Sequence, residues 1–269
     1  MNLGGRVILV NGGTHGLGEA TVRRVVRAGA AGVVIVGRDA RKGRELVGEL
    51  SSGTTRCHHI TADMSQASTP RDVVAEVDRE FGVVHGLVNI AAATSRGDIW
   101  NTTVELWDTM QAVNVRAPFL LLQATAAIMR REGVRGSVVN IGSVSGHGGQ
   151  PFILAYCVSK GALAILTKNA AYSLMRHGIR VNQVNPGWMD TEAEDIVQRR
   201  AHGAQDGWLA VAEADQPMGR LIKPDEVAGL IEFLLSDDSG MMTGTVVDYD
   251  QSVQGAGDAP KPSTQETPQ

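Results

Sequence analysis

The sequence has little cysteine and few aromatic residues. Its two cysteines, Cys57 and Cys157, lie far apart and belong to no CxxC motif, which argues against a disulfide framework or a zinc site. We expect both to be reduced thiols in the core. His58 and His59 lie at the end of a predicted strand and lack the cluster of acidic or cysteine partners that a metal site needs, so no metal site is predicted. Four Trp, three Tyr and four Phe are too few to indicate a stacking platform for nucleic-acid bases.

An excess of basic charge and long hydrophobic runs are also missing. Lys and Arg together number 25 against 29 Asp and Glu, a net charge of -4, and this balance disfavours a nucleic-acid partner. The longest apolar stretches, 119–122 and 124–129, fall well short of the roughly 18 residues that span a bilayer. The first six residues do not resemble a secretion signal. We therefore expect a cytoplasmic protein without a membrane partner.

Apolar runs and helical patterns alternate along nearly the whole chain, and 43% of the 269 residues are hydrophobic, enough for one large core. Strands are predicted at 6–11, 33–37, 56–61, 85–89, 137–142, 179–185 and 245–250. Helices are predicted at 17–30, 41–50, 70–81, 104–131, 155–177 and 224–236. This alternation predicts one doubly wound α/β (Rossmann) domain over residues 1–253, with about seven parallel strands and helices on both faces.

Two stretches depart from the alternation. Residues 187–217 are polar, contain glycine and follow the sixth strand, where ligands bind beyond the carboxyl ends of parallel strands. We expect a lid there, with Trp208 and Met218 in its interior. Residues 254–269 are rich in Gly, Pro, Ser, Thr and Gln and almost lack apolar side chains, which predicts a disordered tail.

A glycine-rich segment, Asn-Gly-Gly-Thr-His-Gly-Leu-Gly at 11–18, joins the first strand to the first helix. Gly12, Gly16 and Gly18 lack a Cβ atom, so the turn can tighten and the backbone can approach a pyrophosphate at the helix N-terminus. A plain surface turn is the alternative. The position directly after a first strand favours dinucleotide binding.

The residue after the second strand indicates which dinucleotide binds. Gly37 is followed by Arg38, whose guanidinium suits the 2′-phosphate of NADP, and His15 in the glycine loop can assist when protonated. NADP is therefore favoured, with NAD as the second possibility. In the alternative interpretation, Arg38 is an ordinary solvated charge and Asp39 caps the next helix.

Tyr156 and Lys160 are four residues apart in a predicted helix and therefore lie on one helix face. An ammonium beside a phenol lowers the phenol's pKa, which suits a Tyr that acts as acid or base. Ser143 follows the fifth strand, so we expect all three side chains near the carboxyl edge of the sheet.

These residues, taken together, resemble the short-chain dehydrogenase/reductase family in its single-domain form over residues 5–252. The resemblance rests on the glycine loop, Asn89-Ile90-Ala91-Ala92, Asn114, Ser143, Tyr156-Cys157-Val158-Ser159-Lys160, and Pro186-Gly187 with Thr191. It implies that Tyr156 is the general acid/base and that Ser143 hydrogen-bonds the reacting oxygen. It also implies that Lys160 holds the nicotinamide ribose and that Asn114 anchors a water relay.

The resemblance also implies the cofactor contacts. They are expected at Gly12, Thr14, His15, Gly16, Leu17, Gly18, Arg38, Asp63, Met64, Asn89, Ala91, Tyr156, Lys160, Pro186, Gly187 and Thr191. The chain departs from the family pattern at Asn11, where Thr is usual, and at Ile90 and Ala92, where Asn and Gly are usual. The Cβ atom of Ala92 narrows the approach of the backbone to a ribose.

The expected reaction is hydride transfer between a nicotinamide and a secondary alcohol or its ketone, or between a sugar hemiacetal and its lactone. Candidate substrate contacts are Ser145, His147, Gln150 and Trp188, and Arg96, Glu192 and Glu194 form a polar rim that favours a polyol or sugar. One alternative is a 3-oxoacyl-carrier-protein reductase, which needs a basic docking patch, and the basic Arg130, Arg131 and Arg135 sit at a helix end. Another is a dinucleotide-binding regulator without turnover.

The resemblance further implies a homo-tetramer. The helices at 104–131 and 155–177 would form one interface, and the last strand, 245–250, would form another.

Overall fold

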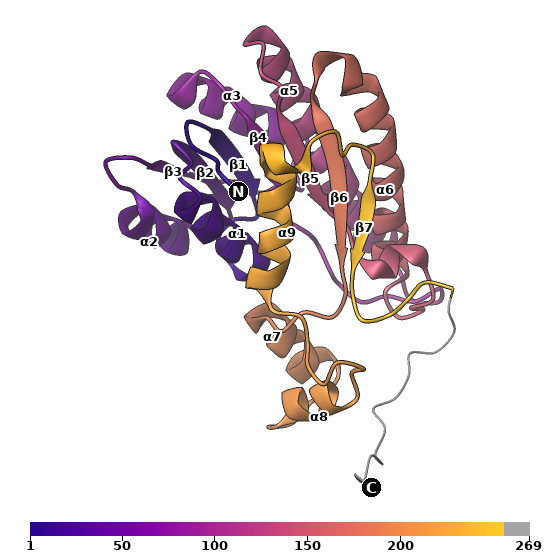
Figure 1. Ribbon diagram of the computed structural model, residues 1–269. Helices are drawn as coiled ribbons and strands as arrows, with labels where there is room; N and C mark the ends of the chain where they lie inside the picture. The colour runs from indigo at the N-terminus through magenta and orange to yellow at the C-terminus, as the bar shows by residue number, and fades with distance from the viewer. Residues whose placement is uncertain (256–269) are drawn as a thin grey trace, which may run out of the picture.

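The computed structural model describes residues 1–255, and all seven strands belong to one parallel sheet (Figure 1). The strands are β1 (Val7–Asn11), β2 (Gly32–Gly37), β3 (Arg56–Thr61), β4 (Gly86–Asn89), β5 (Ser137–Ile141), β6 (Arg180–Pro186) and β7 (Val246–Tyr249). Their spatial order is β3-β2-β1-β4-β5-β6-β7. The predicted doubly wound α/β fold is confirmed.

Helices cover both faces of this sheet. They are α1 (Gly16–Arg27), α2 (Ala40–Leu50), α3 (Thr69–Phe81), α4 (Val104–Gln111), α5 (Ala117–Arg131), α6 (Leu154–Leu174), α7 (Glu192–Ala201), α8 (Trp208–Ala214) and α9 (Pro224–Leu235). Shorter turns are the π-helical η1 (Ala112–Arg116) and the 3₁₀-helical η2 (Val144–His147), η3 (Met175–His177) and η4 (Asp237–Ser239).

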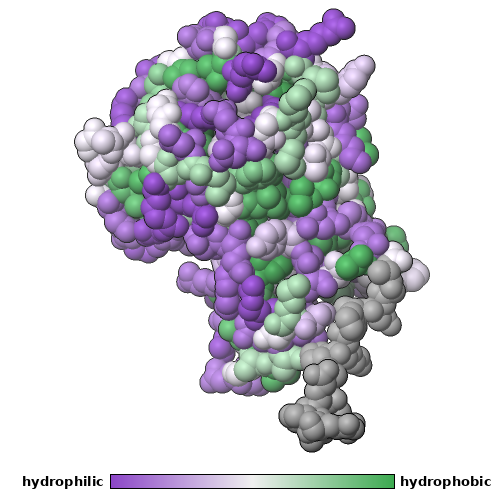
Figure 2. All heavy atoms as spheres, viewed as in Figure 1, coloured by the Kyte–Doolittle hydropathy of each residue, from purple (hydrophilic) through white to green (hydrophobic). Residues whose placement is uncertain are grey.

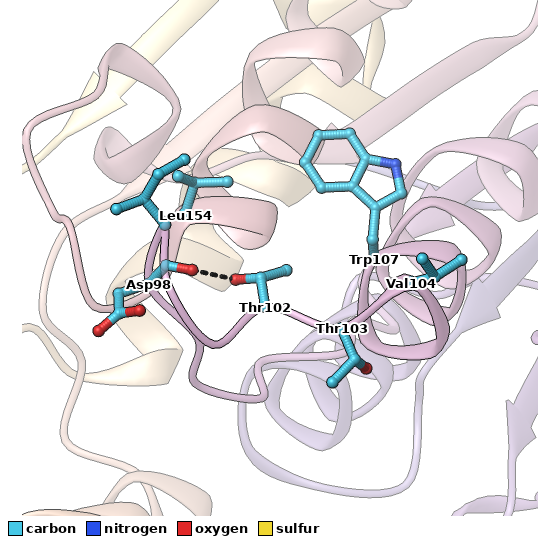
Figure 3. Close-up of a pocket in the computed structure, with 7 residues that line it drawn as sticks. Asp98, Thr102, Thr103, Val104, Trp107 and Leu154 are labelled. Atoms are coloured by element: carbon cyan, nitrogen blue, oxygen red, sulfur yellow. Dashed lines mark hydrogen bonds between the residues drawn. The ribbon is translucent and has the colours of Figure 1, made fainter.

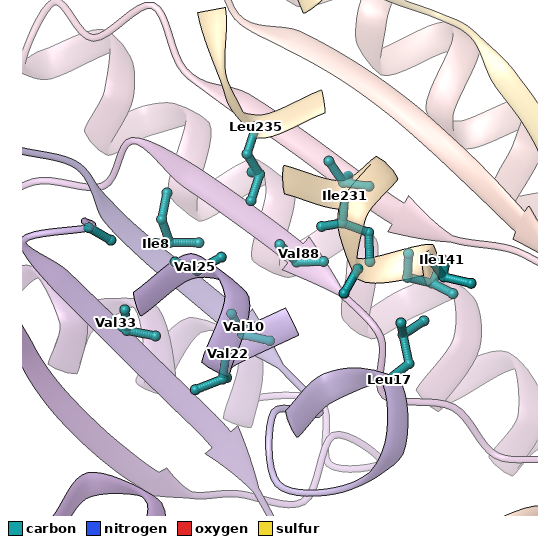
Figure 4. Packing of buried hydrophobic residues seen from close by; sticks show 14 of the residues in the cluster. Ile8, Val10, Leu17, Val22, Val25, Val33, Val88, Ile141, Ile231 and Leu235 are labelled. Atoms are coloured by element: carbon teal, nitrogen blue, oxygen red, sulfur yellow. The ribbon is translucent and has the colours of Figure 1, made fainter. Parts of the chain in front are cut away.

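Two hydrophobic clusters, one on each face, hold the layers together. Because successive strand residues point to opposite faces, Ile8 and Val10 of β1 belong to the cluster under α1 and α9 (Figure 4). Leu9 belongs to the other cluster, under α3 and α5. Both faces are covered, so the strands read as continuous apolar runs such as Val-Ile-Leu-Val in β1.

The strand order indicates where a ligand crevice is expected. The chain proceeds outward from β1 through β2 to β3, then crosses back to β4 on the other side of β1. Ligands bind at such a switch point, beyond the carboxyl ends of the strands. The segments that follow β1, β4, β5 and β6 all begin at this edge.

The predicted continuous helix at 104–131 is wrong in detail, because η1 interrupts it between α4 and α5. A π-helical turn widens the helix by one residue and is frequent at functional sites. By length and composition alone, the combined helix Val104–Arg131 could cross a membrane. The short uninterrupted apolar stretches in the sequence had argued against such a span. That indication is weak because 56% of its most apolar window is buried inside the protein.

The predicted lid region contains two helices, α7 and α8, which form a lobe below the sheet in Figure 1. On the face shown in Figure 2 this lobe carries both hydrophilic and hydrophobic side chains. Trp208 is partly buried there, but Met218 is 69% exposed, so its expected place in the lid interior is wrong. Residues 256–269, most of the predicted tail, lie outside the described residues.

Two expectations about single side chains also need correction. Cys57 is buried as expected, whereas Cys157 is only partly buried. Burial raises the pKa of both thiols, which keeps them protonated. His58 has an acidic partner after all, since its Nε2 lies 2.8 Å from Glu76 Oε1, but an isolated pair of this kind is not a metal site.

Candidate active site

The glycine loop forms a bare backbone cradle between β1 and α1. Gly12 and Gly16 have positive φ angles of 91° and 51°, which glycine adopts without strain. A Cβ atom on Gly12 would lie 2.5 Å from the Ala91 nitrogen, and one on Gly18 would lie 1.8 Å from the Gly12 carbonyl oxygen. Only glycine therefore allows the loop, α1 and the segment after β4 to come this close.

The N-terminus of α1 opens onto this cradle. Its N-cap residue, His15, makes no side-chain hydrogen bond to the helix. Gly18 N donates to the His15 carbonyl at 2.9 Å, which leaves the N–H groups of Gly16 and Leu17 available to an anion. Thr14 is buried, and Leu17 packs into the core below. The donor set and the closeness of the backbone fit the pyrophosphate of a dinucleotide.

A substitution tests the cradle. We expect Gly18→Ala to weaken binding of NADPH or NADH by at least ~10-fold, because the added methyl group overlaps the Gly12 carbonyl and must push the loop apart. Fluorescence titration of the nicotinamide measures this. Gly48→Ala in α2, where a Cβ meets nothing within 4 Å, is the matched control, with unchanged cofactor affinity and a gain of about 0.5–1 kcal/mol in unfolding free energy.

The residues after β2 include an exposed arginine and a helix cap. Arg38 is exposed, and within residues 1–255 its guanidinium makes no hydrogen bond or ion pair. Asp39 caps α2 by accepting from the Lys42 backbone N–H at 2.9 Å, and this hydrogen bond lowers the Asp39 pKa. His15 Nε2 lies 3.6 Å from Asp39 Oδ2. The cap predicted as an alternative is present, and it leaves Arg38 free.

The turns after β3 and β4 line the same edge. Asp63 accepts a hydrogen bond from the Ser65 N–H, which lowers its pKa, and the positive charge of Arg38 adds to this effect. The Met64 side chain is buried in the core, so any cofactor contact there must use its backbone. Ala91 N donates to the Asn11 carbonyl at 3.0 Å.

The segment after β6 connects the sheet to the lid. Pro186 is buried, and Gly187 N donates to the Tyr249 carbonyl at 3.0 Å. Thr191 caps α7 by accepting from the Glu194 N–H at 3.1 Å. A Cβ built on Gly16 would lie 3.7 Å from Thr191 Cγ2. The start of α7 therefore lies close to the glycine loop.

Ser143, Tyr156 and Lys160 meet beside the end of β5. Lys160 is buried, donates from Nζ to the Ile141 carbonyl at 2.7 Å, and lies 5.5 Å from the Tyr156 ring centroid. Ser143 Oγ accepts from the Ser145 N–H at 3.1 Å, which leaves its own hydrogen for donation. The Ser143 hydroxyl also lowers the pKa of the Tyr156 phenol.

Burial nevertheless has the largest effect on the pKa values of Tyr156 and Lys160. It raises the pKa of Tyr156 and lowers that of Lys160 to about 8, because a poorly solvated site disfavours both charged forms. The expected lowering of the Tyr156 pKa by Lys160 is therefore wrong for this structure. The charges of Arg96 and Glu194 also reach the phenol, the first lowering and the second raising its pKa.

Asn114 lies in the π-helical turn η1 and joins two parts of the site. Its Oδ1 accepts from the Ala93 N–H at 2.8 Å, and its Nδ2 donates to the Ala93 carbonyl at 3.0 Å and to Ser159 Oγ at 3.0 Å. Asn114 thus links the segment after β4 to α6, the helix that carries Tyr156 and Lys160. The role of Asn114 in a water relay stays a prediction.

The candidate substrate contacts are distributed around this centre. Ser145 Oγ donates to Gln150 Oε1 at 2.6 Å, and His147 Nε2 lies 2.9 Å from Asp248 Oδ1 on β7. The observed partner of His147 is thus the neighbouring strand. Trp188 Nε1 donates to Glu194 Oε1 at 2.8 Å.

Two lid contacts were not apparent from the sequence. The Trp188 and Trp208 rings stack with centroids 6.2 Å apart, and Arg96 lies over Phe152, with its NH2 3.4 Å from His202 Nε2 at the end of α7. These pairs join residues distant in the chain. The sequence contains no local signal for either pair.

Two surface pockets lie near these elements. One of about 290 Å³ lies between the start of α4 and α6, where Figure 3 shows Trp107 and Leu154 on either side of Thr102, which donates to the Asp98 carbonyl. It contains none of the predicted site residues. The other, about 420 Å³, is in the lid and is lined by Trp188, Trp208 and polar side chains that include Gln198, Asp206 and Asp215.

Comparison with known proteins agrees with this geometry. The family model described as enoyl-(acyl carrier protein) reductase matches residues 12–253. The chain is 34% identical to an uncharacterized oxidoreductase of Thermotoga maritima, covering 93% of this chain and 98% of that protein. It is 32% identical to an NADP-dependent (R)-specific alcohol dehydrogenase of Lentilactobacillus kefiri (94% and 98% covered). It is also 29% identical to a galactitol 2-dehydrogenase of Agrobacterium fabrum (93% and 98% covered).

The matches extend over nearly the whole chain, and they include the glycine cradle and the Ser143, Tyr156 and Lys160 cluster. The chain belongs to the short-chain dehydrogenase/reductase family and is an oxidoreductase that acts on CH–OH groups.

Proposed function

We propose that this protein is an NADP(H)-preferring oxidoreductase that interconverts a secondary alcohol or a sugar or polyol hydroxyl and its carbonyl. The observation that carries the proposal is the convergence of Ser143, Tyr156 and Lys160 at the carboxyl end of β5, beside the glycine cradle. The four catalytic assignments, Asn114 included, are part of this proposal.

The side chains supply the proton chemistry. When bound, the nicotinamide exchanges a hydride with the substrate carbon. During reduction, the Tyr156 hydroxyl gives its proton to the carbonyl oxygen, and during oxidation the phenolate takes the proton from the alcohol. The raised pKa of Tyr156 keeps this proton in place at neutral pH. Ser143 donates a hydrogen bond to the same oxygen and stabilises developing negative charge.

The charge of the lid favours a neutral substrate. Residues 187–217 contain seven Asp or Glu residues and only two Arg, so the lobe offers little positive charge to an anionic substrate. Stacked Trp188 and Trp208 beside polar side chains suit the apolar faces and hydroxyl groups of a sugar or polyol. The galactitol 2-dehydrogenase relative agrees with this class.

The same charge argues against a carrier-protein reductase. An acidic carrier needs a basic docking surface near the site, but Arg130, Arg131 and Arg135 lie just before β5 begins, at the edge of the sheet opposite its carboxyl end. Arg131 is also paired with Asp78 at 2.7 Å and Glu132 at 2.6 Å. Steady-state rates with a polyol panel and with an acyl-thioester ketone distinguish the two classes. We expect kcat/KM to be higher for at least one polyol, and the reverse order would favour the carrier-protein class.

Replacing Arg38 tests the cofactor preference. We expect Arg38→Ala to weaken NADPH binding by at least ~10-fold, because a charge-assisted hydrogen bond to the 2′-phosphate is lost, while the Kd for NADH stays within about two-fold. Titration of both cofactors with Arg38→Ala and with Arg41→Ala, an exposed arginine of α2 paired with Glu45, makes the comparison. Equal losses for the two cofactors would contradict the assignment.

We also propose a cytoplasmic homo-oligomer of the tetrameric type. Val158, Ile165 and Tyr172 are 44%, 60% and 80% exposed and recur every seven residues along α6, so they form one apolar stripe. Such a stripe suits a second copy of the same helix. Light scattering after size exclusion measures the assembly, and Ile165→Lys should shift it toward smaller species.

A further inference from the structure

A continuous row of hydrogen-bonded polar side chains crosses the carboxyl end of the sheet. We call it the amide chain, and it consists of Asp248, Asn185, Gln183, Thr167, Asn140 and Asn89. All except Asp248 are at most 2% exposed. Strand pairing sets the members side by side, because Asn89 is in register with Asn140, Asn140 with Gln183, and Asn185 with Asp248.

The outer half of the amide chain begins at the surface. Asp248, whose side chain is 36% exposed, accepts from His147 Nε2 at 2.9 Å and from Asn185 Nδ2 at 2.9 Å. Asn185 Oδ1 then accepts from Gln183 Nε2 at 2.7 Å. The bonds donated by Asn185 and Gln183 both have their donor on the inner side.

The inner half continues in the same sense. Gln183 Oε1 accepts from the Thr167 hydroxyl at 3.1 Å, and Thr167 Oγ1 accepts from Asn140 Nδ2 at 2.9 Å. Asn140 Oδ1 accepts from Asn89 Nδ2 at 2.9 Å. Asn89 Oδ1 remains, buried and without a partner among the described residues, and so does Nδ2 of Asn11, the residue paired with Asn89 in the sheet.

The direction of these bonds follows from Asp248. A carboxylate only accepts hydrogen bonds, whereas amides and hydroxyls can donate or accept. Asn185 must therefore turn its Nδ2 toward Asp248, and every later group must turn the same way to keep its bonds. The sequence of orientations ends with Asn89 presenting an acceptor, not a donor, beside the glycine cradle.

The backbone makes room for this arrangement next to the catalytic serine. A Cβ atom on Gly142, which directly precedes Ser143, would lie 2.0 Å from Asn185 Oδ1 and 2.3 Å from Gln183 Nε2. The amide chain thus passes directly beneath the turn that carries Ser143. A larger residue at this position would displace it.

We infer that Asp248 is a positioning residue for the cofactor: through the amide chain, its carboxylate fixes Asn89 Oδ1 as a hydrogen-bond acceptor at the end of β4, next to Asn11 and the glycine cradle. This inference rests on the proposed function, because it requires a dinucleotide that donates a hydroxyl at this place. Asp248 lies on the last strand, β7. Its effect on binding at β4 passes through three strand residues, Asn185, Gln183 and Asn140.

A double-mutant cycle on the Kd for NADPH and NADH tests the inference. Asp248→Asn allows both directions of the amide chain, so only part of the molecules present the acceptor, and we expect Kd to rise about three-fold. Thr167→Val interrupts the chain and has a similar effect. Because both act through one chain, the double variant should rise no further than either single variant.

The outcomes are distinguishable. Thr167→Ser keeps the hydroxyl group and should have the wild-type Kd. Asp238 is not part of the amide chain and its side chain is 56% exposed, so Asp238→Asn should leave Kd unchanged. If the double variant raised Kd about nine-fold, the product of two independent effects, the inference would be overturned. An unchanged Kd in Thr167→Val would also overturn it. If the wild-type protein binds neither cofactor, the proposed function itself fails.

Discussion

Replacing Tyr156 by Phe is expected to lower kcat by about 10²- to 10⁴-fold, because the substitution removes the group that transfers the proton. The phenyl ring keeps its place beside Lys160, so the Kd for NADPH should remain within about two-fold. A loss in kcat without a loss in cofactor binding identifies a group that acts in the transition state. Steady-state kinetics combined with fluorescence titration measures both quantities.

Tyr172→Phe is the matched control. Tyr172 lies in the same helix, α6, but is 80% exposed, and its loss of a hydroxyl group should leave kcat unchanged. Near-normal turnover by Tyr156→Phe would exclude Tyr156 as the acid/base. Equal losses in both variants would point to damage to α6 instead of lost chemistry.

Lys160→Met is expected to abolish turnover and yet to stabilise the folded protein at pH 7. The folded-state pKa of Lys160 is about 8, against 10.5 for an unperturbed lysine, so holding the buried ammonium costs on the order of 3 kcal/mol. The lost hydrogen bond to the Ile141 carbonyl offsets about 1 kcal/mol of this gain. Urea unfolding at pH 7 should show a net gain of about 2 kcal/mol.

The pH dependence has a definite sign. Below about pH 8 both folded and unfolded chains hold the Lys160 proton, and the full penalty is present. Between about 8 and 10.5 the unfolded chain binds more protons, so the stability of the wild-type protein at this site rises with pH. The advantage of Lys160→Met should therefore shrink by about 2 kcal/mol between pH 7 and pH 9.5.

Lys168→Met provides the comparison, because Lys168 is an exposed lysine of the same helix. Its difference from the wild-type protein should be the same at both pH values. A constant difference for Lys160→Met would show that Lys160 is not held as a strained cation in the folded protein.

Much of the fold was predictable because its determinants are local. Uninterrupted apolar runs such as Val7–Asn11 and Gly32–Gly37 indicated parallel strands covered on both faces. The glycine loop and the Tyr156 and Lys160 spacing indicated the crevice, since each signal lies within a few consecutive residues. Their family resemblance is confirmed by matches over most of the chain.

Features that depend on distant partners were not predictable. The π-helical turn at Asn114 and the lid contact between Arg96 and His202 join segments from different parts of the chain. The pKa of Tyr156 was expected to fall, because the sequence shows a neighbouring Lys but not the burial that dominates. The amide chain had a visible signal, polar residues such as Asn140 inside apolar strands. Its direction nevertheless depends on Asp248, which lies on β7, two strands away from Asn140.

The most direct test is turnover of the wild-type protein, followed by nicotinamide absorbance, with polyols, aldoses and small secondary alcohols plus NADP⁺ and with their ketones plus NADPH. The account predicts oxidation of at least one alcohol and reduction of its ketone, with one cofactor consumed per product formed. Tight binding of NADPH without turnover of any of these compounds would contradict it, and would indicate a dinucleotide-binding regulator instead.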